Sequence, residues 1–327
     1  MRALLSFRTH LEGGHHMKKI AVIGSGLIGR AWSMVFARAG LTVQLFDIAD
    51  GAVDKAIDLI GDGLEELKSS GLIKEDTSSI LKRITKAKTL EDAVGDVDYV
   101  QENTSERLDI KKEVFSQLDA AAPKHCVLAS STSTIKTSLF SEHLNGRERC
   151  IVAHPVNPPH VVPIVEVSPA TWTSDEITQK TYELHQRVGQ VPIIVKKEVS
   201  GFILNRLQAA LLREAWRLVG EDYVSVEDLD KTVRDGLGLR WAFMGPFETI
   251  DLNAPGGVAD YADRFGGAFD EMMQNVSYEQ WSPDLISKVE QQRREIMSHA
   301  EHGAREEWRD KRLMALVAHK RAMDEPA

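Results

Sequence analysis

The first two hundred residues alternate between short apolar runs and longer segments in which apolar residues recur at every third or fourth position. A short run rich in β-branched residues is typical of a buried strand, and the longer recurrence is typical of an amphipathic helix. The predicted strands lie at 19–23, 42–47, 96–103, from 126 onward, 150–153, 163–167 and 191–195. The predicted helices lie at 27–39, 52–70, 74–83, 106–121, 137–144 and 175–189. This alternation predicts an α/β fold with a doubly wound Rossmann-type sheet.

After residue 198 only helical periodicity remains, which predicts a second, smaller all-α domain. Ser225 with Asp228 three positions later is an N-cap signal. The predicted helices lie at 201–221, from 225 onward, 257–274, 282–300 and 304–323. We therefore divide the chain into an α/β domain at 17–198 and a helical domain at 199–327.

Residues 1–16 fit neither domain. They lack the apolar core of ~7–15 residues that a signal peptide requires, and they contain Gly13, Gly14, His15 and His16. We interpret them as an extension, natural or added, before a native-like start at Met17.

Composition narrows the class of protein. The chain has 327 residues, 43% of them hydrophobic and 27% charged, and no apolar run approaches the ~18 residues of a membrane helix, so we expect a soluble protein of two domains. Its net charge of -9 is spread without a basic stripe, which argues against a nucleic-acid partner. The two cysteines, Cys126 and Cys150, lie in apolar surroundings. We expect reduced, buried thiols, no metal site and a cytoplasmic location.

A glycine-rich turn follows the first predicted strand. Gly24, Gly26 and Gly29 have the spacing GxGxxG and open the first predicted helix. In such a turn one glycine makes the tight bend, one lets backbone approach a pyrophosphate, and one lets the helix pack closely on the strand. The pyrophosphate then binds at the helix N-terminus, beside Leu27 and Ile28.

The glycine turn and its flanking strand and helix predict a dinucleotide-binding site, and Asp47 indicates which dinucleotide binds there. It ends the second predicted strand, 18 positions after Gly29, where its carboxylate can accept hydrogen bonds from the adenosine ribose. The same charge repels a 2′-phosphate, and Ile48 and Ala49 offer no arginine to bind one. We therefore predict NAD rather than NADP as the cofactor.

Two ionisable residues lie close to predicted strands. His154 directly follows the strand at 150–153, and Glu166 interrupts the next apolar run. Burial of an unpaired carboxylate is costly, so Glu166 is expected to have a partner. From these residues alone, His154 remains equally compatible with a structural role at a strand end.

Several motifs together resemble one known family. The turn GSGLIG, the cluster SSTST, the segment AHPVNPP and the helix start GFILNRL resemble the 3-hydroxyacyl-CoA dehydrogenase superfamily. The phrases IVAHPVNPP, EVSGFILNRLQ and EAWRLV are most similar to its lambda-crystallin branch, which includes L-gulonate 3-dehydrogenases. The resemblance extends from Lys18 to the C-terminus.

The resemblance implies roles for four catalytic residues. His154 matches the family's general base, and Glu166 matches the partner that orients its imidazole. Ser133 and Asn205 match donors that hold the oxygen which becomes a carbonyl. Without the family, Ser133 is one of six serines and threonines from 130 to 137 that can satisfy turn backbone, and Asn205 can be a helix-surface residue.

Three further positions follow from the same resemblance. Glu106 and Lys111 correspond to residues that contact the nicotinamide half of NAD, although a solvated helix start explains them equally well. Arg240 occurs where the acyl-CoA enzymes have an uncharged residue, and its guanidinium can pair with a substrate carboxylate. A salt bridge between domains is the alternative for Arg240.

The resemblance implies an NAD-dependent enzyme that oxidises the 3-hydroxyl of a small hydroxy acid such as L-gulonate. A short-chain L-3-hydroxyacyl-CoA dehydrogenase is one alternative, and a structural, crystallin-like protein without turnover is another. The family pairs subunits through the helical domain, so we also expect a homodimer.

Overall fold

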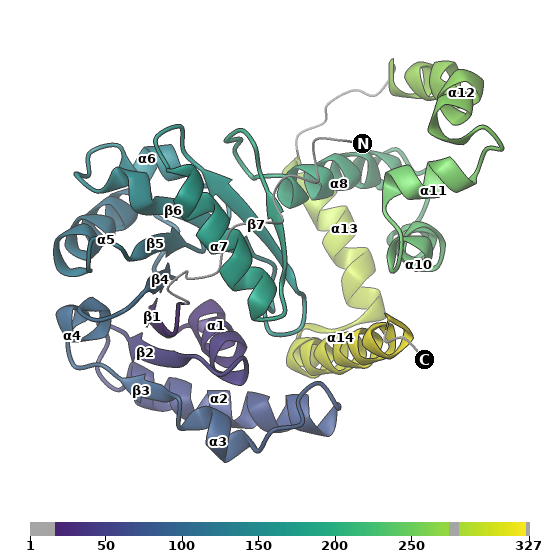
Figure 1. Cartoon of the computed structure of the whole chain (residues 1–327). Helices are drawn as coiled ribbons and strands as arrows, with labels where there is room; N and C mark the ends of the chain where they lie inside the picture. Colours follow the sequence, from purple (N-terminus) through teal and green to yellow (C-terminus); the bar gives the residue numbers. More distant parts are fainter. Residues whose placement is uncertain (1–16, 275–280, 325–327) are drawn as a thin grey trace. The chain divides into compact units, whose positions relative to one another are not determined.

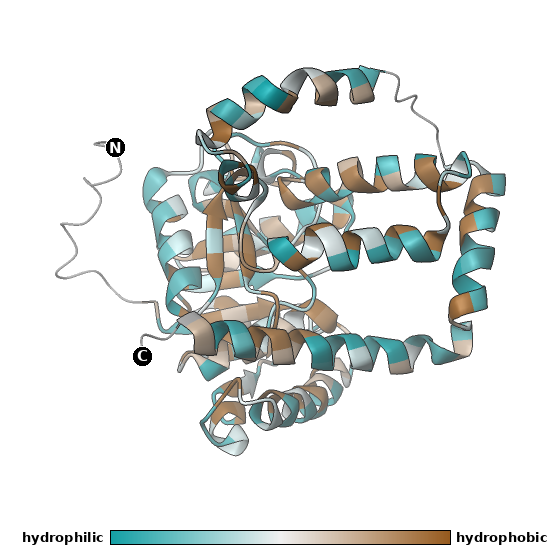
Figure 2. Ribbon diagram, turned by 90° about the vertical axis from the view of Figure 1, so that its right-hand side faces the viewer, coloured by the Kyte–Doolittle hydropathy of each residue, from teal (hydrophilic) through white to brown (hydrophobic). Residues whose placement is uncertain are grey.

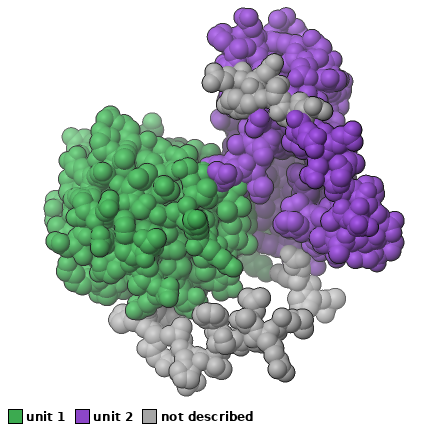
Figure 3. Space-filling view, turned by 90° about the horizontal axis from the view of Figure 1, so that it is seen from above, with its two compact units in different colours: residues 1–203 green, residues 204–327 purple. Residues whose placement is uncertain are grey.

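The computed structural model describes residues 17–274 and 281–324. The predicted extension at 1–16 therefore lies outside the described residues. The chain divides between Ile203 and Leu204 into two compact units, which Figure 3 shows in different colours. This division lies slightly beyond residue 198, where the sequence pattern changes.

The first unit is built on an eight-stranded sheet, as the sequence pattern predicts for this fold class (Figure 1). Its strands, in spatial order, are β3 (Ile84–Lys86), β2 (Thr42–Phe46), β1 (Lys19–Ile23), β4 (Tyr99–Glu102), β5 (Val127–Ser130), β6 (Cys150–Pro155), β7 (Ile164–Pro169) and β8 (Val191–Ile194). Neighbouring strands are parallel except β6 and β7, which form an antiparallel pair. Seven of the strands were predicted.

Several short elements were missed, among them β3 and the helix α4 (Leu90–Val94). β3 has only three residues, of which Ile84 alone is buried, so it has no apolar run to detect. Helix α4 has only five residues and begins at Thr89, whose hydroxyl accepts a hydrogen bond from the Asp92 N–H at 3.1 Å. Tertiary contacts with the sheet stabilise such short elements more than their local sequence does.

Helices cover both faces of the sheet (Figure 1). Helix α1 (Leu27–Arg38) and helix α7 (Asp175–Arg187) pack on one face, while α4, α5 (Leu108–Ala121) and α6 (Thr137–Ser141) pack on the other. The remaining helices of this unit are α2 (Ala52–Ser69), α3 (Thr77–Leu81) and the short 3-10 helix η1 (Arg147–Arg149).

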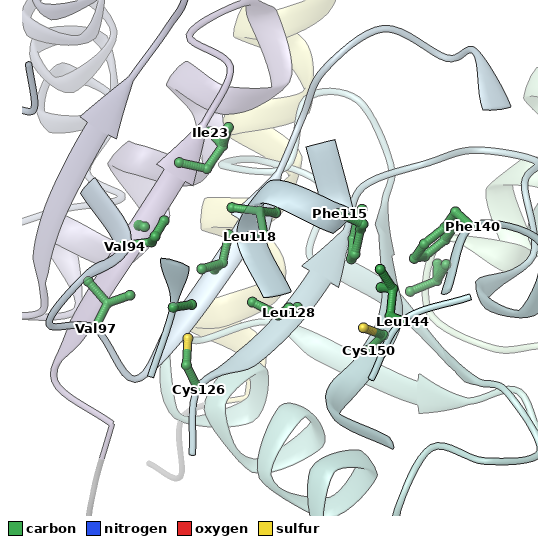
Figure 4. Packing of buried hydrophobic residues seen from close by; sticks show 14 of the residues in the cluster. Ile23, Val94, Val97, Phe115, Leu118, Cys126, Leu128, Phe140, Leu144 and Cys150 are labelled. Carbon is green, nitrogen blue, oxygen red and sulfur yellow. The ribbon is translucent and has the colours of Figure 1, made fainter. Parts of the chain in front are cut away.

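Apolar side chains between the sheet and α4 to α6 form one continuous core, which Figure 4 shows from close by. Phe115 of α5 and Phe140 of α6 are both fully buried there, with ring centroids 4.3 Å apart. Cys126 and Cys150 belong to the same core as free thiols, as predicted. Burial raises the pKa of Cys126 to about 12 and raises the pKa of Cys150 further still, so neither thiol is a nucleophile at neutral pH.

The second unit contains only helices among its described residues. They are α8 (Leu204–Gly220), α9 (Val226–Lys231), the π-helical segment η2 (Thr232–Leu237), α10 (Gly238–Trp241), α11 (Pro246–Leu252), α12 (Gly257–Gln274), α13 (Pro283–Ile296), η3 (His299–Glu301) and α14 (His302–Asp324). The predicted N-cap is confirmed, because the Ser225 hydroxyl accepts a hydrogen bond from the Asp228 N–H at 3.1 Å.

This second unit buries few apolar side chains. Its buried hydrophobic residues in the described part of the chain are Val219, Val226, Ala254, Leu285 and Met314. Apolar residues instead alternate with polar ones along many helical surfaces, as the hydropathy colouring of Figure 2 shows. Across residues 17–274 and 281–324, no helix combines the length and the apolar character needed to cross a lipid bilayer.

Candidate active site

The candidate site lies along one edge of the sheet. The parallel strands β1, β4, β5 and β6 all end at this edge, and the antiparallel strand β7 begins there. The strand order reverses between β1 and β4, because the chain first adds β2 and β3 on one side and later adds β4 to β6 on the other. Ligands of open α/β sheets bind outside the carboxyl ends of the strands at such a reversal.

The glycine turn after β1 is shaped for a ligand at this reversal. Gly24 has φ +91°, and a Cβ there would lie 2.7 Å from the Asn103 carbonyl oxygen. A Cβ on Gly29 would lie 1.8 Å from the Gly24 carbonyl oxygen, so α1 packs directly on the turn. A Cβ on Gly26 would meet no described atom within 4 Å. Gly24 and Gly29 thus serve internal packing, whereas Gly26 leaves open space beside the turn.

The N-terminus of α1 faces the same space. Gly26 is its N-cap, no described side chain caps it, and its first turn contains no acidic residue. Leu27 is 55% exposed and Ile28 is half-buried. The free N–H groups and the helix dipole therefore favour an anionic group at this end of α1.

Asp47 after β2 is held beside the turn. Its Oδ2 accepts hydrogen bonds from the Ser25 N–H at 2.7 Å and the Ser25 hydroxyl at 2.8 Å, and its Oδ1 accepts one from the Ala49 N–H at 3.0 Å. Partial burial tends to raise the pKa of Asp47, but these hydrogen bonds lower it by more, so the pKa lies below its ordinary value. Asp47 is therefore a fixed negative charge.

A buried ion pair joins the end of β4 to helix α5. Glu102 ends β4, Lys111 lies on α5, and their side chains are 0% and 1% exposed. The Lys111 ammonium donates to Glu102 Oε1 at 3.1 Å and to Oε2 at 3.0 Å. Glu102 also accepts hydrogen bonds from the Ser130 hydroxyl at 2.6 Å and from the Thr104 N–H at 2.6 Å. This pair ties the ends of β4 and β5 to α5.

Glu106 anchors the polar loop that follows β5. Its Oε1 accepts hydrogen bonds from the Thr132 hydroxyl at 2.6 Å, the Ser133 N–H at 2.9 Å and the Thr134 N–H at 3.0 Å. Partial burial tends to raise the pKa of Glu106, but these hydrogen bonds and the nearby Lys111 charge lower it by more. Lys111 Nζ lies 3.9 Å from Glu106 Oε2. Glu106 therefore lies between Lys111 and the loop that carries Ser133.

His154 and Glu166 meet at the end of β6. They are direct partners in the antiparallel β6–β7 register, and His154 Nδ1 lies 2.8 Å from Glu166 Oε2. Glu166 is 0% exposed, and the His154 side chain is 7% exposed. A carboxylate on Nδ1 holds the proton there, which leaves Nε2 as the nitrogen that can accept one. The buried partner that Glu166 was expected to need is thus His154.

Comparison with known proteins identifies the family. The model of the 3-hydroxyacyl-CoA dehydrogenase NAD binding domain matches residues 19–199, and the model of the C-terminal domain of the same enzymes matches residues 201–295. The chain belongs to the 3-hydroxyacyl-CoA dehydrogenase family. Its cofactor is therefore NAD, as Asp47 and the glycine turn predict.

Individual relatives place the chain within this family. Lambda-crystallin of Oryctolagus cuniculus is 40% identical over 93% of this chain and 97% of its own length. L-carnitine dehydrogenase of Oceanobacillus iheyensis is 35% identical over 92% of this chain and 96% of its own length. The crystal structure of an NAD+-dependent 5-dehydrogenase of a pyridine carboxylic acid (FHMPC) superposes with a TM-score of 0.80, at 27% identity, over 95% of this chain and 100% of that one. The lambda-crystallin likeness suggested by the sequence motifs is confirmed.

Two of the predicted site residues belong to the second unit. Asn205 lies half-buried in the first turn of α8. Arg240 lies exposed in α10, directly after the π-helical segment η2. The described residues include no salt-bridge partner for Arg240 within the second unit.

Three residues of the site were not predicted. Ser25 holds Asp47, Glu102 holds Lys111, and Phe202 packs its ring 5.3 Å from the His154 ring. Glu102 had a detectable signal, because it is an acid inside a predicted strand. The contacts of Ser25 and Phe202 join segments far apart in the chain, and a single sequence carries no sign of them.

Proposed function

We propose that this protein oxidises the 3-hydroxyl of a small free hydroxy acid, such as L-gulonate, to the 3-keto acid with NAD as the oxidant. The observation that carries the proposal is the His154–Glu166 pair, an imidazole held at 2.8 Å by a buried carboxylate on the ligand-binding edge of the sheet. A purely structural role, the crystallin-like alternative, has no need of such a pair.

His154 is the proposed general base. With its Nδ1 hydrogen-bonded to Glu166, Nε2 takes the proton of the substrate hydroxyl as the C3–H bond breaks. NAD supplies the acceptor for the hydride that leaves C3. Glu166 keeps the imidazole in the tautomer that the step needs and stabilises the imidazolium that results.

Ser133 and Asn205 are the proposed donors to the reacting oxygen. The main chain of Ser133 is fixed by Glu106, which gives its hydroxyl a defined starting position. Donors held in place before reaction stabilise developing charge without a reorganisation cost. We assign Glu106 and Lys111 to the nicotinamide end of the cofactor site. Lys111 is buried, so we assign it an indirect role, in which its charge holds Glu102 and Glu106 in place.

Arg240 supports a free acid over a thioester. A guanidinium pairs with a carboxylate through two hydrogen bonds, and a CoA thioester presents no carboxylate next to its reacting carbons. The relatives agree with this choice in part, because L-carnitine, named in one of them, is itself a small 3-hydroxy carboxylate. One observation favours the alternative function, a short-chain 3-hydroxyacyl-CoA dehydrogenase. Both family models that match the chain are named for acyl-CoA enzymes.

One assay separates these functions. NADH formation is measured at 340 nm with L-gulonate, L-carnitine and L-3-hydroxybutyryl-CoA at equal concentrations. We expect turnover of a free acid well above that of the thioester. The reverse ranking would favour the acyl-CoA dehydrogenase, and NAD binding without any turnover would favour the crystallin-like role.

We further propose a cytoplasmic homodimer formed through the second unit. Support comes from an aromatic ridge on α12, where the Tyr261 ring contacts the tilted Phe265 ring at a centroid distance of 4.8 Å and stacks with the Phe269 ring at 6.3 Å. Phe265 and Phe269 are 43% and 49% exposed despite these ring contacts. Exposed apolar ridges of this kind are typical of subunit interfaces.

A further inference from the structure

Two consecutive residues with left-handed backbone lie directly before the boundary between the two units. Gly201 has φ +74° and Phe202 has φ +48°. Glycine adopts this conformation freely, but a bulky aromatic residue does so only when its surroundings impose it. Phe202 is also 0% exposed. Strained backbone of this kind persists only where the surrounding structure imposes it, and it occurs most often at functional sites.

The turn at Phe202 reaches the catalytic pair in two ways. The Phe202 ring lies against the His154 imidazole, with ring centroids 5.3 Å apart and planes inclined at 41°. The N–H of the following residue, Ile203, donates to Glu166 Oε1 at 2.7 Å. The other oxygen of Glu166 holds His154 Nδ1 at 2.8 Å. Both members of the pair are thus in contact with the same three-residue turn.

We propose that Phe202 is a positioning residue for His154, an inference that rests on the proposed function. Its ring closes one side of the imidazole, and its left-handed backbone aims the Ile203 N–H at Glu166. One Glu166 oxygen is bound by the Ile203 N–H and the other by His154 Nδ1, so the carboxylate is fixed in one orientation. The imidazole that it holds is therefore fixed as well. The backbone that leads into the second unit is thereby coupled to the geometry of the base.

The competing interpretation is that Phe202 only fills the core. It belongs to the same buried cluster as Phe115, which is also 0% exposed but packs against Phe140. Phe115→Leu is therefore a matched control, because it removes the same atoms from the same core without touching His154. Phe202→Leu and Phe202→Met are the test variants, and the flexible, unbranched Met side chain can adapt to the vacated space if Leu folds poorly.

Each variant of the full chain is compared by turnover, NAD affinity, thermal unfolding and the ¹⁵N resonances of the His154 ring. We expect Phe202→Leu and Phe202→Met to lower kcat at least about tenfold below Phe115→Leu, by loosening the geometry of the base. NAD affinity should stay within about twofold, because the cofactor site is built from other residues. The His154 ring resonances should change in the Phe202 variants and not in Phe115→Leu.

The ring resonances decide the outcome. If they match the wild-type values in both Phe202 variants, His154 is not positioned by Phe202 and the inference is wrong, whatever happens to kcat. Because the resonances require no turnover, they also separate this inference from the proposed function. The His154 resonances could change in the Phe202 variants while the wild-type protein oxidises none of the hydroxy acids. That result would support the positioning role of Phe202 and overturn the proposed activity.

Discussion

His154 and Glu166 lie directly opposite each other in the antiparallel pair β6–β7, with His154 Nδ1 2.8 Å from Glu166 Oε2. They are twelve positions apart in the chain, and the intervening loop turns the backbone around so that the register brings them together. Because Glu166 is fully buried, water does not compete for its oxygens. The imidazole is thus held rigidly by secondary structure rather than by a loop.

Replacement of His154 tests the base directly. His154→Gln should lower kcat by about 10²-fold or more, because glutamine cannot accept the substrate proton. The dissociation constant for NAD, measured by protein fluorescence, should change by less than about twofold. His125→Gln is the matched control, since His125 has a side chain that is 65% exposed and should tolerate the change. Wild-type turnover in His154→Gln would remove this residue from the mechanism.

Asp47 should set the preference for NAD over NADP. Asp47→Ala is expected to lower the NAD to NADP affinity ratio by about tenfold or more, because opposed like charges cost several kcal/mol. Since the pKa of Asp47 lies below its ordinary value, the wild-type preference should persist down to about pH 5. Titration with both dinucleotides at pH 5 and pH 7 measures these effects.

Ser25 provides the control for Asp47. Ser25→Ala removes one hydrogen bond to the carboxylate but keeps the Ser25 main-chain N–H and the negative charge. The preference for NAD should therefore survive in Ser25→Ala. Equal loss of preference in both variants would mean that the turn geometry, and not the charge, selects the cofactor.

Glu106 should act by holding the Ser133 loop. Glu106→Ala leaves the Ser133 and Thr134 N–H groups without their acceptor and should lower kcat about 10- to 100-fold through misplacement of the loop. Glu106→Gln keeps an acceptor oxygen in the same place, so its kcat should stay within about threefold of wild type. Equal activity of the Ala and Gln variants would show that the anchor is unimportant.

The charge of Glu106 also predicts a dependence of stability on pH. Its pKa is lowered in the folded protein, so its stabilising effect is complete above the ordinary pKa of glutamate. That effect should be lost only as the pH falls through the lowered value. The difference in unfolding temperature between wild type and Glu106→Gln should therefore be constant above the ordinary glutamate pKa and become smaller as the pH falls below it.

Arg240 should distinguish substrates. Arg240→Ala is expected to raise KM for a free hydroxy acid about tenfold or more, because a hydrogen bond to a charged group contributes ~1.5–3 kcal/mol. KM for L-3-hydroxybutyryl-CoA should change little. Arg234→Ala is the control, since Arg234 is also exposed but is paired with Asp235 at 2.6 Å. A larger effect on the thioester would favour the acyl-CoA alternative.

The aromatic ridge on α12 should mediate dimer formation. Analytical ultracentrifugation of the wild type should give twice the chain mass of 36.4 kDa. Phe269→Asp, which places a charge on the ridge, should shift the protein to the monomer mass. Leu139→Asp on α6 is the control, since Leu139 is 44% exposed and lies in the first unit. A dimer that persists in Phe269→Asp would place the interface elsewhere.

The sequence by itself determined the fold class, the cofactor and the identity of the catalytic candidates. Apolar periodicity and glycine spacing are local properties, because a strand, a helix and the turn between them each form from neighbouring residues. The turn from Gly24 to Gly29 and the acid Asp47 are therefore visible in the chain, and the NAD-binding domain is confirmed. Short elements such as β3 were missed, because they depend on distant partners.

Only the tertiary structure decided how these residues are held. Ser25 supports Asp47, Glu102 supports Lys111, and Phe202 contacts His154, in each case across at least nine positions of the chain. Such contacts depend on strand register, burial and backbone angles such as the left-handed turn at Phe202, none of which is encoded in a local pattern. The residues proposed to react were readable from the chain through its family resemblance, whereas the residues that contact them became visible only when folding brought distant segments together.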